Sequence, residues 1–102
     1  MKISQKKQEK ICEQILAYLF QQNPKPLFTA HIASELARDE EFIKKMLLKL
    51  KAKKFILEVK KNPKGIEYFK RSRWKLTDEI YNLYKKGQEN AFNDYIQLDE
   101  SL

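Results

Sequence analysis

Residues 31–61 read HIASELARDEEFIKKMLLKLKAKKFILEVKK, and the spacing of their apolar side chains changes along the run. The first part predicts a short amphipathic helix over about residues 30–37, and the second predicts a longer helix from about residue 40 to about residue 54. Their inward-facing residues are Ile32, Ala33 and Leu36 in the first helix and Ile43, Leu47 and Leu50 in the second, with Phe42 and Met46 partly covered. Two short helices joined by a tight turn, the second longer and basic, form a helix-turn-helix.

Both predicted helices have candidate caps at their N-terminal ends. Thr29 is placed to cap the first helix and Asp39 to cap the second, because short side chains with an oxygen accept hydrogen bonds from the free amides of a first turn. Glu40 and Glu41 follow Asp39, at the end of the helix where the dipole favours negative charge.

After residue 54 the apolar period becomes two, which indicates strands. Residues 55–59 form the first predicted strand, residues 60–65 a lysine-rich turn, and residues 66–70 with 73–76 the returning strand. Thr77 then caps a last helical stretch over about residues 78–96, with a kink or interruption near Gly87.

Another amphipathic helix is predicted upstream, over about residues 5–22. Ser4 is its candidate cap, and the Asn23-Pro24-Lys25-Pro26 segment stops it because proline has no backbone N–H. Residues 27–29 are expected to be a short extended piece. Cys12 lies near the apolar stripe of this helix, where a thiol packs as a small hydrophobe. The sequence therefore predicts a mainly α chain with a small β-hairpin, an α+β class, in a single domain over residues 1–102.

Charge is distributed unevenly along the chain. The net charge of +7 is the sum of 0 over residues 1–41, +11 over residues 42–75 (thirteen Lys or Arg against Glu58 and Glu67) and −4 over residues 76–102. A basic block between a neutral and an acidic segment gives the folded protein a positive side, which attracts polyanions such as nucleic acids.

The run quoted above, followed by a basic turn and WKLTDE, resembles a winged helix-turn-helix domain of the kind common in small bacterial and archaeal transcription regulators. The resemblance covers about residues 27–84. Arg38 and Lys54 stand where such domains often have glycine, and both are tolerable if their backbones avoid positive φ.

The resemblance implies that residues 40–54 enter a DNA major groove while the hairpin, as a wing, touches adjacent phosphates or the minor groove. Double-stranded DNA is the expected partner. The candidate DNA-binding residues are Lys44, Lys45, Leu48, Lys49, Lys60, Lys61, Lys64, Lys70, Arg71 and Arg73. Lys44 and Lys45 are expected in the groove, and the wing lysines are expected on phosphates, which give affinity without sequence information.

Several of these features have simpler interpretations. A lysine-rich helix face is often only solvated, and two carboxylates at the tip of a groove-binding helix, Glu40 and Glu41, would meet phosphates. Trp74, Tyr68 and Phe69 are placed either to stack on bases or to pack on the helices. His31 is expected on a helix surface rather than as a metal ligand.

Motifs for other chemistry are missing from the sequence. The single His and single Cys lie on different predicted helices, and the sequence has no glycine-rich phosphate loop, HExxH motif or pair of CxxC motifs. We therefore expect no enzyme, metal, cofactor or small-molecule ligand. No apolar run is long enough for a membrane span, no signal-peptide pattern follows the N-terminus, and a lone Cys fits a reducing setting, so a cytoplasmic, nucleoid-associated protein is predicted.

Two functions from different classes remain open. One is a DNA-binding transcription regulator acting as a homodimer, since Tyr18, Tyr81, Phe92, Tyr95 and Ile96 exceed what the core of such a domain consumes. The other is a winged-helix protein–protein interaction module in a nucleoprotein assembly.

Overall fold

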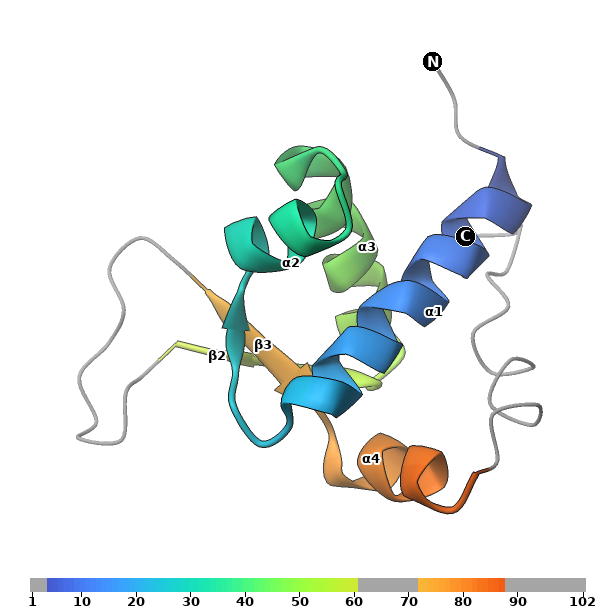
Figure 1. The fold of residues 1–102 in the computed structure, drawn as a ribbon, viewed down its shortest axis with the longest axis vertical. Helices are drawn as coiled ribbons and strands as arrows, with labels where there is room; N and C mark the ends of the chain where they lie inside the picture. Colours follow the sequence, from blue (N-terminus) through green and yellow to red (C-terminus); the bar gives the residue numbers. More distant parts are fainter. Residues whose placement is uncertain (1–3, 61–71, 88–102) are drawn as a thin grey trace.

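The computed structural model describes residues 4–60 and 72–87. Its elements, in order, are α1 (Gln5–Gln22), β1 (Leu27–Phe28), α2 (Thr29–Glu35), α3 (Glu40–Ala52), β2 (Ile56–Val59), β3 (Arg73–Leu76) and α4 (Asp78–Lys85) (Figure 1). The predicted α+β class is confirmed. Residues 61–71 lie outside the described residues, and they include most of the predicted turn and the first part of the predicted returning strand. The predicted helical stretch beyond residue 87 lies outside them as well.

The bounds of α1 agree with the prediction. The Ser4 hydroxyl accepts a hydrogen bond from the Lys7 amide at 3.2 Å, and the helix ends directly before the cis Asn23–Pro24 peptide bond. Ile15 and Leu16 are fully buried, so one stripe of the helix faces the core.

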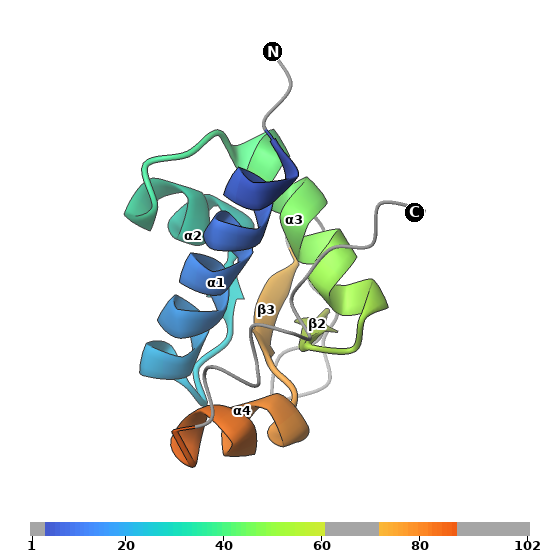
Figure 2. The ribbon, with the colours of Figure 1, turned by 90° about the vertical axis from the view of Figure 1, so that its right-hand side faces the viewer.

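A three-stranded antiparallel sheet has β3 in its centre, in the order β1-β3-β2. Leu27 lies opposite Trp74 on one side of β3, and Ile56 lies opposite Leu76 on the other. Figure 1 shows α2 and α3 at one end of the molecule and α4 at the other, with α1 crossing between them. Figure 2, turned by 90°, shows α3 and α1 on either side of β3.

The core is formed between α1, α3 and the sheet, with further contributions from α2 and α4. Its fully or almost fully buried members include Ile15, Leu19, Ile32, Ile43, Leu47, Leu50, Trp74, Leu76 and Ile80. Met46 was expected to be partly covered, but it is buried with only 2% of its surface exposed. Its sulfur lies 3.9 Å from the Cys12 sulfur, and burial raises the pKa of the Cys12 thiol to about 11. The predicted packing role of Cys12 is confirmed.

Thr29 does not cap α2 as predicted. The helix begins at Thr29 itself, after Phe28, which makes no side-chain capping bond. The Thr29 hydroxyl instead accepts a hydrogen bond from the indole N–H of buried Trp74 at 2.8 Å. A tertiary partner has replaced the local one, since an unpaired buried indole N–H is costly.

Arg38 avoids positive φ, as its identity requires, but Lys54 does not. Ala37, not Arg38, has φ of 54° after α2, and Lys54 has φ of 65° after α3. Each follows a helix in the same way: the amide of Arg38 bonds to the Ala33 carbonyl at 2.9 Å, and that of Phe55 to the Leu50 carbonyl at 3.0 Å. These bonds define Schellman motifs, whose geometry requires a left-handed residue at this position.

Candidate nucleic-acid interface

The turn between α2 and α3 is closed by backbone and side-chain hydrogen bonds. The Asp39 carboxylate accepts from the Phe42 amide at 3.1 Å, as predicted, and Asp39 thereby fixes the start of α3. Ile43 and Leu47 are fully buried against the rest of the core. Because the apolar stripe is held inward, the opposite face of α3 is turned to solvent.

That opposite face carries three of the predicted site residues. Lys44, Lys45 and Leu48 are exposed, and they are neighbours on the helix surface because residues three and four apart lie on the same side. Glu40 and Glu41 are exposed at the N-terminal end of the same helix. The outward face of α3 therefore begins acidic and continues with two lysines and a leucine.

Lys49 lies one helical turn after Lys45, at the edge of this face nearest to α1. Its ammonium donates a hydrogen bond to the Gln8 side-chain oxygen on α1 at 3.1 Å. Lys49 is therefore engaged by α1 and less available to a phosphate than Lys44 and Lys45 are.

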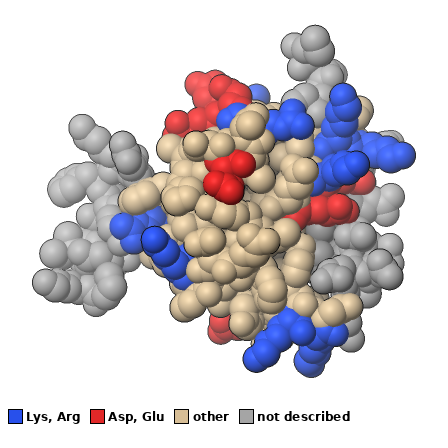
Figure 3. Space-filling model, viewed as in Figure 1, with Lys and Arg blue, Asp and Glu red and all other residues tan. Residues whose placement is uncertain are grey.

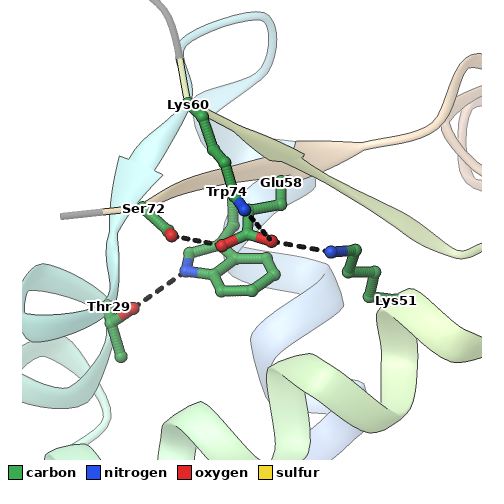
Figure 4. Close-up of polar contacts among 6 residues, drawn as sticks. All are labelled: Thr29, Lys51, Glu58, Lys60, Ser72 and Trp74. Carbon is green, nitrogen blue, oxygen red and sulfur yellow. Dashed lines mark hydrogen bonds and ion pairs between the residues drawn. The ribbon is translucent and has the colours of Figure 1, made fainter. Parts of the chain in front are cut away.

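Glu58 joins α3 to the two strands of the hairpin (Figure 4). Its carboxylate accepts a hydrogen bond from Lys51 at 2.7 Å, accepts another from the Ser72 hydroxyl, and lies 4.0 Å from the Lys60 ammonium. These hydrogen bonds, that from Lys51 first, hold the pKa of Glu58 below its usual value. Lys51 is therefore partly neutralised and less available to a phosphate.

The sequence did not single out Glu58 as a functional residue. A signal was present, because the period of two along β2 places Glu58 on the same side as buried Ile56 while Leu57 points to solvent. A carboxylate on the inward side of a strand, in a segment with thirteen Lys or Arg residues, is expected to pair with one of them.

Of the hairpin, the structure describes only the residues at its base. Lys60 is exposed at the end of β2. Arg73 on β3 is half-buried, and its guanidinium carbon lies 4.5 Å from the centroid of the Phe28 ring, in a cation–π contact across the sheet. Lys61, Lys64, Lys70 and Arg71 lie outside the described residues.

Aromatic side chains were the second candidate group for nucleic-acid contact. Trp74 has no exposed surface, so it packs in the core and does not stack on bases. Tyr68 and Phe69 lie outside the described residues. His31 is exposed, and its Nε2 is 2.8 Å from the Tyr18 hydroxyl on α1.

The face that carries α1 differs from the α3 face in charge. Figure 3 shows it largely uncharged across its middle, with most charged side chains towards its edges. An open hollow of about 390 Å³ between α1 and α2 is lined by Gln14, Tyr18, Gln21, Glu35 and Leu36. Among residues 4–60 and 72–87, no group of three or more His, Cys, Asp or Glu side chains is placed to hold a metal ion. No helix in the same part of the chain has the length and apolar character needed to cross a bilayer.

Comparison with known proteins identifies the fold through solved structures. No family model and no curated protein matches the sequence. A mutant of MepR from a multidrug-resistant S. aureus clinical isolate matches 90% of this chain with a TM-score of 0.61 and 21% identity. Another S. aureus MepR mutant, bound to an oligodeoxyribonucleotide, matches 94% with a TM-score of 0.54 and 22% identity. The PcaV transcriptional regulator from Streptomyces coelicolor, in complex with its natural ligand, matches 92% with a TM-score of 0.52 and 19% identity.

The chain has a winged helix-turn-helix fold. It spans 67%, 76% and 62% of the three matched chains in the same order, so each of them is longer. At these identities the likeness concerns the arrangement of helices and strands. In this fold the helix-turn-helix comprises α2 and α3, and the hairpin of β2 and β3 is the wing.

Proposed function

We propose that this protein binds duplex DNA and regulates transcription. The outward face of α3 enters the major groove, and the lysine-rich end of the wing, residues 60–71, lies against adjacent phosphates. The observation that carries the proposal is the uncovered surface of Lys44, Lys45 and Leu48, which the α2–α3 turn presents as one face. The protein then acts in the cytoplasm, where it is bound to DNA.

Physical arguments support this assignment. The major groove of B-DNA admits an α-helix, and lysines on that helix reach guanine acceptors or phosphate oxygens. The net charge of +11 over residues 42–75 matches a polyanion. MepR, one of the proteins of similar fold, has been observed bound to an oligodeoxyribonucleotide.

The proposed contacts divide by kind. Lys44, Lys45 and Leu48 face the bases, while Lys60, Lys61, Lys64, Lys70 and Arg71 contact phosphates. Lys49 and Arg73 are placed at the margin, because Lys49 is bonded to α1 and Arg73 lies over the Phe28 ring.

A second copy of this chain is the proposed partner on the α1 side. Interface centres are depleted in charged residues, and the largely uncharged face over α1 has this property. Tyr81 is less available for a dimer contact than the sequence suggests, because it is half-buried and its ring centroid lies 5.2 Å from that of Phe20. In a two-fold dimer the two α3 helices address half-sites about one DNA turn apart, so an inverted repeat is expected.

A protein-docking module is the second candidate function. Glu40 and Glu41 favour it, because both are exposed at the tip of α3, where phosphates approach a groove-binding helix. In this alternative the basic surface binds an acidic protein, and no saturable DNA complex forms.

Fluorescence anisotropy with labelled duplex DNA tests the proposal. We expect Lys44→Ala/Lys45→Ala and Lys61→Ala/Lys64→Ala each to weaken binding by about tenfold or more, since several phosphate or groove contacts are removed. The matched control is Lys85→Ala/Lys86→Ala, which removes the same charge from an exposed pair at the end of α4. Equal losses in all three variants would show that only net charge matters, and the assignment of α3 and the wing would then be wrong.

A further inference from the structure

Leu48 is the large apolar side chain of α3 that the core does not use. It is 46% exposed, whereas Ile43, Met46, Leu47 and Leu50 are buried. Among the described residues, Leu57 on β2 is the other large exposed apolar side chain, at 50%. Single exposed leucines are common on protein surfaces, so exposure alone assigns no role.

The position of Leu48 distinguishes it. It lies one helical turn after Lys44 and Lys45, on the outward side, and one turn before exposed Ala52. Lys51, three residues after Leu48, forms an ion pair with Glu58 at 2.7 Å. Leu48 thus lies between two lysines with exposed ammonium groups, Lys44 and Lys45, and one lysine whose ammonium is paired, Lys51.

This arrangement matches the chemistry of one base. In the major groove every base presents hydrogen-bonding groups, but only thymine also presents a methyl group. An isobutyl side chain has no polar atom for those groups, but it gains by removing a methyl group from water. The two lysines beside it are suited to the phosphates or guanine acceptors that flank the site.

We infer that Leu48 reads the 5-methyl group of thymine in the major groove and gives the protein its preference at that base pair. The inference rests on the proposed function, since it assumes that α3 lies in the groove. Lys44 and Lys45 then contact guanine acceptors or phosphates next to this base pair, and Leu48 distinguishes thymine from the other bases.

Replacement of thymine by deoxyuridine tests the inference at the level of one methyl group. A tight-binding duplex is first selected from a random pool with the wild-type protein, and each thymine is then replaced singly. Base pairing is retained and only the methyl group is lost. We expect binding of the wild-type protein to weaken about fourfold at one or more positions, the change for losing one buried methyl group.

Two variants assign the effect to a residue. Leu48→Ala is expected to bind the thymine and deoxyuridine duplexes equally, and because Leu48 is exposed the substitution leaves the core intact. Leu57→Ala, at a matched exposed leucine, is expected to keep the ratio of about fourfold. Circular dichroism melts confirm that both variants are folded.

The outcomes separate the two claims. Salt-dependent binding by wild type with no thymine-to-deoxyuridine difference at any position overturns the role of Leu48 and leaves the proposed function standing. A difference that persists unchanged in Leu48→Ala also overturns it, because another group then reads the methyl. A wild-type protein that forms no saturable complex overturns both claims.

Discussion

Lys54 closes α3 with a backbone φ of 65°, a conformation that glycine adopts at lower energy than any other residue. Its amide bonds to the Lys51 carbonyl at 2.9 Å, so the left-handed turn is part of the helix end and cannot relax independently. The same geometry occurs at Ala37 between α2 and α3. Both residues keep this strained conformation because the chain changes direction there, between α2 and α3 at Ala37 and between α3 and β2 at Lys54.

Lys54→Gly is therefore expected to stabilise the protein. Relief of the left-handed strain exceeds the extra entropy that glycine gives the unfolded chain, and the free energy of unfolding should rise by about 0.5–1 kcal/mol. Urea denaturation measures the change. Lys54→Ala, which removes the charge but keeps the strain, should change the free energy of unfolding by much less.

Lys53→Gly provides the opposing control. Lys53 has φ of −83° in the right-handed region, so glycine there brings no relief of strain and is expected to destabilise. Stabilisation by both glycine substitutions would contradict the explanation.

Thr29 holds the buried Trp74 indole in place. Thr29→Val keeps the shape but leaves the indole N–H without its acceptor, and we expect the free energy of unfolding to fall by about 1–3 kcal/mol. Thr29→Ser, which keeps the hydroxyl, should lose clearly less in the same denaturation experiment. No loss of stability in Thr29→Val, or a larger loss in Thr29→Ser than in Thr29→Val, would contradict the role of the hydrogen bond.

At the scale of elements, Glu58 connects the C-terminal half of α3 to the base of the wing. It bonds to Lys51 on α3 and to Ser72 just before β3, while it belongs to β2. Three segments are thus fixed by one carboxylate. This connection sets how the wing base is held beside the face of α3.

Glu58→Gln is expected to lower the free energy of unfolding near pH 7 by about 0.5–1 kcal/mol, as for a partly exposed ion pair. The folded pKa of Glu58 is lowered below its unfolded value, so its contribution is complete above the unfolded pKa and is lost as the pH falls through the folded pKa. The difference between wild type and variant should therefore shrink in acid. Urea denaturation at several pH values measures it.

Glu35→Gln, at an exposed carboxylate on α2, is the control for that experiment. Its difference from wild type should stay small at every pH. A wild-type advantage over Glu58→Gln that persists unchanged below about pH 3, under the usual carboxyl range, would contradict the role of the ionised carboxylate.

Elements set by local signals were predicted well from the sequence. The bounds of α1 follow from Ser4 and the proline segment, and the start of α3 follows from Asp39. Features that depend on distant partners were not predicted. Thr29 was assigned to a cap because its partner Trp74 is 45 residues away, and the two residues of β1 are too few to show alternation or to indicate pairing with β3.

The candidate site residues also fall into two groups: those that a local pattern places and those whose contacts depend on distant partners. Periodicity was sufficient to place Lys44, Lys45 and Leu48 on the outward side of α3. The attachment of Lys49 to Gln8, 41 residues away, and of Lys51 to Glu58 depends on tertiary packing. A charge count alone therefore overstates how many lysines of α3 are available to DNA.

At the scale of the whole molecule, the proposed function uses two separate surfaces: the α3 face for DNA, and the largely uncharged middle of the α1 face for a second copy of this chain. We expect a dimer by light scattering at tens of micromolar. Gln14→Lys/Gln21→Lys, at two exposed residues of α1, should shift it towards monomer because charges are placed in the contact. Asn82→Lys, at an exposed residue of α4, is the control, and a strictly monomeric wild type would contradict the proposed dimer.

We propose that the basic surface of this fold binds DNA phosphates. The salt dependence of duplex binding is the measurement that tests this binding. Anisotropy titrations between about 50 and 300 mM salt give the slope of log K against log salt, which falls by about 0.9 for each phosphate neutralised. With roughly five lysine or arginine contacts, we expect a saturable complex with a slope of about −4.5. Absence of a saturable complex even at about 50 mM salt, or a slope near zero, would contradict it.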